Sequence, residues 1–348
     1  MVKKVHRTAR IALQTTPGQA RRCFELMVSA GDVWAWVIEC NHALRAWSLS
    51  PVVNYQALCR ELSGNNFGEL AQHSARRVLE RYSTAWFAAA ARRKEGQRSG
   101  FPRRKRRLFP VIWQQGNFTI EGDRIRLALA RGSRPLTVRL GRDLPYPQEA
   151  LRTVTLIHEA GRLCLDVTAL VPVENHDLDK DKVCGVDLGI IHPFALATGT
   201  DALVVSGRAL RAEERLHMAD TKARATKMGR RAPKKGQRGS RRWKKLRASQ
   251  RKAEARHRRR IRQAHHEAAK EVVSWALAHR AGRLAVGDLR GITASDAGRK
   301  HNLRLRQWRR THLLRALKDK AEVAGIEVVM VDERGTSSTC PDCLTKSV

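Results

Sequence analysis

The sequence predicts a β-rich domain interrupted by helices, followed by an α/β domain. Three observations lead to this fold class. Short segments of alternating apolar residues lie between positions 96 and 173, helical patterns precede and follow them, and two later apolar segments end in an aspartate. With 348 residues, 42% of them hydrophobic, the chain is long and apolar enough for two or three folded domains.

The N-terminal third predicts one strand and a helical insert. Apolar residues alternate over residues 9–13, which favours a short strand. Thr16–Pro17 is a typical helix start because proline suits the first helical position. A helical pattern then runs to about Trp47, and a second one covers about residues 67–93. We expect the helical insert to span residues 16–95.

The next segment predicts antiparallel strands. Glu159-Ala160-Gly161 lies between two apolar runs, as in a hairpin turn. Together with the N-terminal strand, these segments predict a small β-barrel made of residues 1–15 and 96–173. The expected strands are 118–120, 125–127, 136–140, 154–156 and 163–167.

The last part of the chain predicts a mixed sheet. A strand ending in Asp187 is followed by a hairpin, helices, a parallel strand, a helix and a final strand, which is the element order of an RNase H-like sheet. We expect this domain over residues 174–335, with a basic helical insert at 208–262 made of two long helices around a loop. The expected strands are 183–187, 194–197, 202–205, 284–288 and 326–331, with a buried helix face at 268–277 and a basic helix at 303–321.

The charge points to a nucleic-acid partner. Lys and Arg total 68 against 33 Asp and Glu, which gives a formal net charge of +35 and a pI near 11.2. Backbone phosphates release counterions to each cation that contacts them, so nucleic acid is the expected polyanion. A surface kept charged only for solubility would mix both signs, and no amphipathic membrane anchor accompanies the basic residues.

The cysteines and the N-terminus predict a cytoplasmic protein. Seven scattered cysteines, an odd number, favour a reducing compartment over a disulfide framework. The first residues run into no apolar signal segment, and no apolar stretch is long enough to span a bilayer.

Three ordered motifs carry a resemblance to a known family. Gly185-Val186-Asp187-Leu188-Gly189 resembles the first RuvC motif of the TnpB family, the insertion-sequence-encoded relatives of type V CRISPR effector nucleases. Residues 284–289 and then Thr336-Ser337-Ser338-Thr339-Cys340-Pro341-Asp342-Cys343 match later landmarks in the right order. The likeness is loose over the whole chain and closer from Cys184 to Cys343.

The resemblance implies an RNA-guided DNA endonuclease from a transposable element. It implies a wedge-type barrel, a helical recognition insert and a RuvC nuclease domain, with a guide RNA and a double-stranded DNA target as partners. Base pairing would then read the sequence while the protein holds the heteroduplex by its backbone. The RuvC centre would hold two Mg²⁺ ions with three carboxylates. Nothing in the sequence indicates the strand-transfer machinery of a transposase.

The chain departs from that pattern at the acidic residues. Asp187 matches the first carboxylate, although a turn aspartate after a core strand would look the same locally. The family's Glu-Asp-Leu is Gly287-Asp288-Leu289 here, and Asp288 should point to the opposite face of its strand. Glu333 is the expected replacement, or else an exposed charge at a strand end. The third carboxylate normally follows a second zinc knuckle, which this sequence does not reach, so we expect Mg²⁺ binding to be weak or lost.

Cys340 and Cys343 have the spacing of a zinc knuckle. They supply two of the four ligands of a closed zinc site, so residues 336–348 are expected to form an incomplete zinc-knuckle segment. The alternative is a pair of reduced, unliganded thiols.

Basic residues are expected to contact phosphates, which position a nucleic acid without specifying its sequence. Trp243 and Trp308 either stack on bases or belong to the core. His265, His266 and Glu267 are expected on the surface. The expected nucleic-acid contacts are Arg103, Arg104, Lys105, Arg241, Arg242, Lys244, Lys245, Arg304, Arg306, Arg309 and Arg310.

Three functions follow as hypotheses. The first is an RNA-guided DNA-binding protein whose incomplete nuclease centre does not cut. The second is an active endonuclease that uses Asp187 with Glu333 and further residues beyond the given C-terminus. The third is a decayed transposon protein that binds RNA nonspecifically.

Overall fold

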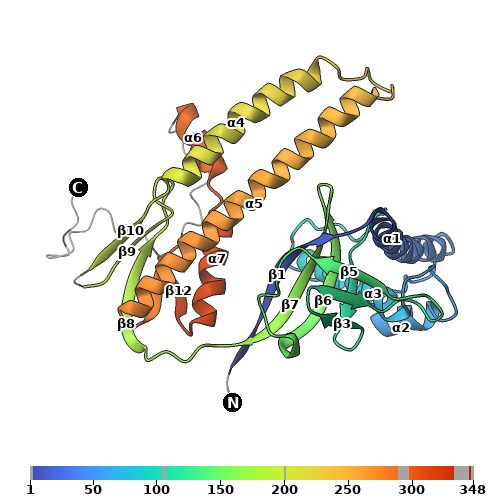
Figure 1. Ribbon diagram of the computed structural model, residues 1–348, viewed down its shortest axis with the longest axis horizontal. Helices are drawn as coiled ribbons and strands as arrows, with labels where there is room; N and C mark the ends of the chain where they lie inside the picture. Colours follow the sequence, from blue (N-terminus) through green and yellow to red (C-terminus); the bar gives the residue numbers. More distant parts are fainter. Residues whose placement is uncertain (1–2, 104–106, 200, 289–297, 333–344, 346–348) are drawn as a thin grey trace. The chain divides into compact units, whose positions relative to one another are not determined.

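The chain forms two compact units, His6–Val171 (the N-terminal unit) and Met1–Val5 with Pro172–Val348 (the C-terminal unit). The computed structural model describes residues 3–103, 107–199, 201–288, 298–332 and 345 (Figure 1). Among these residues, no helix combines the length and apolar character needed to cross a bilayer.

The N-terminal unit is built on a seven-stranded sheet in the order β2-β6-β7-β1-β5-β4-β3. The strand pairs β2–β6, β6–β7, β1–β5, β4–β5 and β3–β4 are antiparallel. The sheet is barrel-like and nearly closed, which confirms the expected β-barrel. Its strands are β1 (Lys4–Gln14), β2 (Val111–Gln114), β3 (Phe118–Glu121), β4 (Arg124–Leu127), β5 (Leu136–Leu140), β6 (Leu151–Glu159) and β7 (Arg162–Pro172).

Alternation and turn chemistry explain these strands. Leu136, Val138 and Leu140 of β5 are buried while the residues between them are exposed, so one face of the strand lines the core. Ala160 and Gly161 join β6 to β7 with φ values of +47° and +89°. Two central residues with positive φ are typical of the tight turns that favour a two-residue hairpin, and the predicted hairpin is confirmed.

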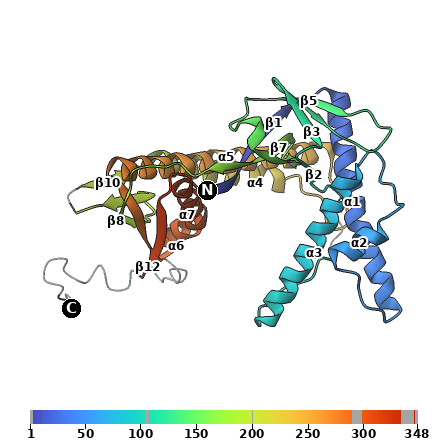
Figure 2. The same cartoon turned by 90° about the horizontal axis from the view of Figure 1, so that it is seen from below.

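Three helices belong to the same unit: α1 (Pro17–Ala46), α2 (Tyr55–Glu61) and α3 (Gln72–Lys94). Thr16 caps α1, and its side chain and that of Gln19 satisfy each other's backbone N–H groups, so the predicted start is confirmed. The second predicted helix begins later than expected because Gly68 has a φ of +64°, which a right-handed helix excludes. Figure 2 shows α1 and α3 crossing with α2 beside them.

The C-terminal unit contains a five-stranded sheet in the order β10-β9-β8-β11-β12. The pairs β8–β9 and β9–β10 are antiparallel, and β11 runs parallel to both β8 and β12. This is the predicted RNase H-like arrangement. The strands are β8 (Asp179–Asp187), β9 (Phe194–Ala197), β10 (Ala202–Val205), β11 (Ala281–Gly287) and β12 (Glu327–Val331).

Helices α5 and α7 cover one face of this sheet. Cys184, Val186, Leu284 and Val286 alternate along β8 and β11 and form one buried cluster with side chains of both helices, such as Leu317. The neighbouring strand residues therefore point to the opposite face, where Asp187 lies. The helices are α4 (Arg208–Gly229), α5 (Arg241–Ala278), α6 (Gly298–Gln307) and α7 (Arg310–Val323).

Two helices differ from the expectation. The predicted buried face at 268–277 is not a separate helix but the last part of α5, which runs unbroken for 38 residues. The predicted basic helix at 303–321 is divided into α6 and α7. Arg309 breaks the helix because its φ and ψ of −86° and +52° are not helical, while the N–H of Trp308 still donates to the carbonyl of Arg304 at 2.9 Å.

Candidate active site and nucleic-acid interface

Asp187 is the last residue of β8. It lies where the C-terminal ends of the three parallel strands β8, β11 and β12 come together. Val186 lies in register with Val286, and Gly287 lies in register with Val331. Asp187, Gly287 and Val331 are therefore neighbours on adjacent strands and share the face that α5 and α7 leave open. The Asp187 side chain is exposed, as a ligand for an external group must be. The predicted position at a strand end is confirmed.

The loop after Asp187 is shaped by two glycines. A Cβ atom on Gly189 would lie 2.6 Å from the carbonyl oxygen of His192, and one on Gly207 would lie 2.2 Å from that of Ile191. Both distances are too short for any other residue, so these glycines allow the loop to fold tightly against itself. The backbone thus approaches Gly189 closely, and the approach is made by the protein's own chain.

The described residues do not complete a two-metal centre. Mg²⁺ needs several oxygen ligands in near-octahedral geometry. The register neighbours of Asp187 are Ala195 and Gly287, with Val331 one strand further, and none of these side chains offers an oxygen. Asp288 follows β11, and its N–H donates to the carbonyl of Val331 at 2.8 Å. No group of three or more acidic, histidine or cysteine side chains is placed to hold a metal ion in the described ranges. Glu333, Cys340 and Cys343 lie outside those ranges.

The N-terminal end of α5 presents a cluster of exposed cations. Ser240 caps the helix by accepting from the N–H of Trp243 at 3.2 Å. The Arg247 guanidinium lies 4.7 Å from the centre of the Trp243 ring, a cation–π contact that orients both side chains. The cluster is free of ion pairs with carboxylates across the described part of the chain, and it comprises Arg241, Arg242, Lys244 and Lys245.

The other expected phosphate contacts are dispersed. Arg103 and Arg304 are exposed, whereas Arg309 lies at the start of α7 with its Nε 3.8 Å from Glu214 Oε1. Arg310 is half-buried on the first turn of α7. Arg104, Lys105 and the side chain of Arg306 lie outside the described residues.

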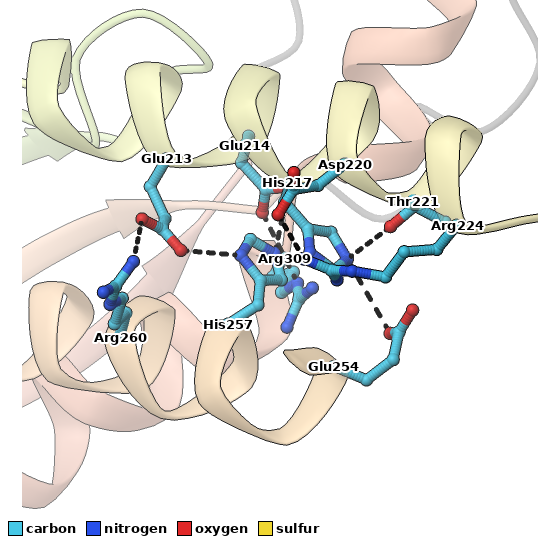
Figure 3. A network of polar contacts seen from close by, with 10 residues as sticks. All are labelled: Glu213, Glu214, His217, Asp220, Thr221, Arg224, Glu254, His257, Arg260 and Arg309. Carbon is cyan, nitrogen blue, oxygen red and sulfur yellow. Dashed lines mark hydrogen bonds and ion pairs between the residues drawn. The ribbon is translucent and has the colours of Figure 1, made fainter. Parts of the chain in front are cut away.

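A histidine pair joins α4 to α5 and was not predicted from the sequence (Figure 3). His217 and His257 stack face to face, with ring centroids 3.7 Å apart and planes only 1° from parallel. The His257 side chain is 3% exposed, and its Nδ1 lies 3.2 Å from Glu213 Oε1. Its Nε2 lies 3.3 Å from Glu214 Oε2. The pair therefore sits between carboxylates of the facing helix.

Further ionic contacts extend this network. Arg260 donates to Glu213 Oε2 at 3.0 Å, and His217 Nε2 lies 3.7 Å from Glu254 Oε2. Burial works against ionised Glu213, but hydrogen bonds from His257 and Arg260 prevail and lower its pKa. Burial, and then the charge of His257, lower the pKa of His217. Glu213, Glu214 and Glu254 thus lie between α4 and α5 and hold the two helices together.

His265 was expected on the surface, and this is wrong. Its side chain is only 5% exposed, because α5 turns it toward Leu313 and Arg309 near the start of α7. Burial lowers the pKa of His265 to about 4, and the neighbouring charges of His312, Arg309 and His266 act in the same direction. The pKa of His266 is also lowered, chiefly by burial.

A basic cavity of about 300 Å³ lies between α5 and α7 beside these histidines. Of its lining residues only Asp319 is acidic, so the cavity is strongly cationic in character. Such a surface suits an anion with several oxygen atoms, of which phosphate is the natural case. The charged and titratable lining residues are Arg258, Arg262, His265, His266, Arg309, His312, Arg315 and Asp319.

Comparison with solved structures finds proteins of similar fold. The complex "Cas12f1-sgRNA-target DNA" is matched with 12% sequence identity and a TM-score of 0.68, over 99% of this chain and 92% of that chain. The mini RNA-guided endonuclease CRISPR-Cas_phi3 is matched with 10% identity and a TM-score of 0.47, over 99% and 88%. A CRISPR-Cas12f ternary complex is matched with 14% identity and a TM-score of 0.40, over 95% and 74%. Only the first likeness is close enough to support an argument, and it shows the fold.

The family is indicated by a sequence match at the C-terminus. Residues 311–347 match the family model described as Cas12f1-like, TNB domain. No curated protein matches the chain. The TNB-domain match and the fold together support the TnpB-like or Cas12f-like family that the sequence motifs predict.

Proposed function

We propose that this protein is an RNA-guided DNA-binding protein of the TnpB type. The observation that carries the proposal is the fold, which corresponds over 99% of the chain to a protein solved with a single guide RNA and its target DNA. The net charge of +35 supports a large polyanionic partner such as a nucleic acid. The TNB-domain match at residues 311–347 supports the same conclusion from the sequence.

The division of labour follows from the chemistry of the exposed side chains. The cation cluster at the N-terminal end of α5 consists of exposed Arg and Lys side chains, and we assign them to backbone phosphates, whose contacts give affinity without choosing a sequence. A guide RNA then selects the DNA by base pairing, and the protein recognises the shape and backbone of the heteroduplex. We place these events in the bacterial cytoplasm or nucleoid.

We further propose that the DNA is held without being cut. Asp187 can supply one carboxylate ligand to a metal ion. The adjacent strand ends at Gly287, which has no side chain to supply a second ligand. A single exposed carboxylate binds Mg²⁺ weakly, and a pair of metal ions needs more. We derive no cleavage step from these residues.

Cleavage with a relocated ligand is the second candidate. Val331 lies in register with Gly287 and is 40% exposed on the face of Asp187. Glu333 follows Val331 by two residues, and a carboxylate supplied there would be the second ligand that Gly287 lacks. Zn²⁺ binding by Cys340 and Cys343 is a separate proposal, and two thiolates alone make an incomplete site.

Sequencing of the RNA that copurifies with the protein tests the main proposal. A single structured transcript is the expected result, and DNA complementary to its guide should be retained in mobility-shift assays while scrambled DNA is not. A random mixture of transcripts would instead support a decayed, nonspecific RNA-binding protein. Incubation of the complex with target DNA and Mg²⁺ then tests cutting. Product that disappears in both Asp187→Ala and Glu333→Gln would support the endonuclease and overturn the noncutting proposal.

A further inference from the structure

The basic cavity takes its charged residues from one face of each of two helices in the C-terminal unit. On α5 the lining residues recur at helical spacing, from Arg258 through Arg262 to His266. On α7 they are three and four residues apart, from His312 through Arg315 to Asp319. The two helices pack side by side (Figure 1), so both charged faces converge on one volume.

Three arginines of the cavity have no anionic partner. Arg258, Arg262 and Arg315 are exposed, and none of them forms an ion pair with a carboxylate in the described ranges of the chain. The fourth arginine, Arg309, lies 3.8 Å from Glu214 Oε1. Like charges that line one cavity repel one another, so an anion placed among these guanidinium groups lowers the free energy of the site.

The buried histidine of the cavity responds to this positive potential. Burial lowers the pKa of His265 to about 4, and the charges of His312, Arg309 and His266 act in the same direction. The cations thus work against a further positive charge at this position. An anion in the cavity would have the opposite effect, because it favours the charged imidazole.

The charges of the lining residues indicate the charge of the ligand. Four arginines less one aspartate leave a net charge of +3 when the histidines are neutral. A terminal phosphoryl group carries a charge of about −1.5 to −2 at pH 7, so two linked groups match the lining. A nucleic-acid strand spreads its single charges along its length and matches one compact cavity less well. The guanidinium fork also suits phosphoryl oxygens, to which it donates two parallel hydrogen bonds.

The size and the wall of the cavity favour bare phosphates over a nucleobase. Its volume of about 300 Å³ exceeds the value of about 150 Å³ at which a cavity in another protein holds benzene. Two or three linked phosphoryl groups therefore fit. The described lining residues include no Phe, Tyr or Trp on which a base could stack, and the apolar part of the wall is Ile261 and Ala316.

We propose that the basic cavity binds an oligophosphate of two or three phosphoryl groups, held by arginines of both α5 and α7. Two sources share this chemistry, a free oligophosphate such as pyrophosphate and the 5′-triphosphate end of an RNA. A free ligand goes beyond the proposed function, whereas an RNA end rests on it and deepens it. In both cases the ligand contacts two helices at once and stabilises their packing.

Calorimetric titration of the protein freed of nucleic acid, at physiological ionic strength, tests the site. Pyrophosphate and tripolyphosphate should each bind once per chain, and sulfate should bind at least tenfold more weakly. Hydrogen exchange of peptides from α7 should slow when pyrophosphate binds, because the ligand holds this helix against α5.

Two variants and one control separate the cavity from the general charge of the chain. Arg262→Gln and Arg315→Gln should each weaken pyrophosphate binding at least tenfold and abolish the slowing of exchange in α7. Arg256→Gln removes the same charge from an exposed position of α5 that does not line the cavity, and it should leave the affinity within twofold of the wild type.

A short RNA distinguishes the two sources. The same transcript is prepared with a 5′-triphosphate and with a 5′-hydroxyl end, and each form competes with pyrophosphate. Stronger competition by the triphosphate form, lost in Arg262→Gln, identifies the RNA end as the ligand. Weak competition by both forms supports a free oligophosphate. Competition by the hydroxyl form as strong as that of tripolyphosphate would indicate ordinary backbone contacts and overturn the proposal.

Three further results overturn it. They are equal affinity for sulfate and pyrophosphate, equal loss in Arg256→Gln and Arg262→Gln, and the absence of pyrophosphate binding. Guide-dependent DNA retention is scored separately on the assembled complex. If retention persists while the cavity fails these tests, only this inference fails. If retention is lost while pyrophosphate still binds, only the proposed function fails.

Discussion

Acidification should destabilise the C-terminal unit through His265. Its pKa in the folded protein is about 4, below the ordinary value of 6.5, because it is buried among cationic groups. Between these two values the unfolded chain binds a proton that the folded chain does not, so stability is present above pH 6.5 and is lost as pH falls toward 4. The full difference corresponds to about 3 kcal/mol, of which about 2 kcal/mol is lost between pH 7 and pH 5.

The magnitude can be measured by comparing two proteins at two pH values. The free energy of unfolding of the C-terminal unit is measured in urea, with hydrogen exchange of peptides from β11 as the signal. His265→Gln removes the titrating group, so the loss of unfolding free energy between pH 7 and pH 5 should be about 2 kcal/mol smaller than in the wild type. The other histidines remain in both proteins, so the difference reports His265 together with its coupling to His266 and His312.

The surroundings of His265 provide the control and the link to ligands. His192→Gln makes the same substitution at an exposed histidine of the same unit and serves as the matched control. A phosphate-rich ligand in the basic cavity beside His265 should raise its pKa and reduce the pH dependence. An equal loss of stability in the wild type and in His265→Gln would refute the reasoning.

Three further predictions concern the metal, the helical insert and the phosphates. Gly287→Glu adds a carboxylate beside Asp187 and should give a Mg²⁺-dependent stabilisation, about 2.7 kcal/mol at a hundredfold excess over Kd, which thermal unfolding would detect and which Gly287→Gln should lack. Asn41→Ala removes the hydrogen bonds to both backbone groups of Val52, 2.7 and 2.9 Å long, and should cost about 1–3 kcal/mol in urea unfolding, with a cost near zero counting against it. Replacing the four cations at the start of α5 with glutamine should flatten the salt dependence of DNA binding by about 3–4 units of log–log slope, and an unchanged slope would remove them from the interface. Those four are Arg241, Arg242, Lys244 and Lys245.

Several strands were predictable because their chemistry is local, whereas β2 was not among the expected strands. Alternating apolar residues identify β3, β4 and β5, and the turn at Ala160 identifies the β6–β7 hairpin. The continuity of α5 was not predictable in this way. Residues 241–254 of α5 are mostly polar and none of them is buried, so only the part from Ala255 onward shows the burial pattern of a packed helix. Tertiary packing, and not local pattern, joins the two parts.

The candidate site was predictable in part. The place of Asp187 at a strand end follows from its motif, and strand register then puts it beside Gly287. The pair of His217 and His257 could not be foreseen, because the two residues are separated by a loop and their contact depends on how the helices align. One signal was available: Glu213, His217 and Asp220 recur at helical spacing and mark one polar face of α4.

The exposed start of α5 has an electrostatic consequence. Residues 241–254 precede the first buried position of the helix and extend about 20 Å, at 1.5 Å per residue. Mobile ions attenuate charge–charge interactions over a Debye length of about 8 Å at physiological ionic strength. Salt therefore screens the charges at the first residues of α5 from the part of the helix that packs on the sheet. A polyanion that binds only the first residues of α5 is therefore largely screened from charges that lie beyond the first buried position of the helix.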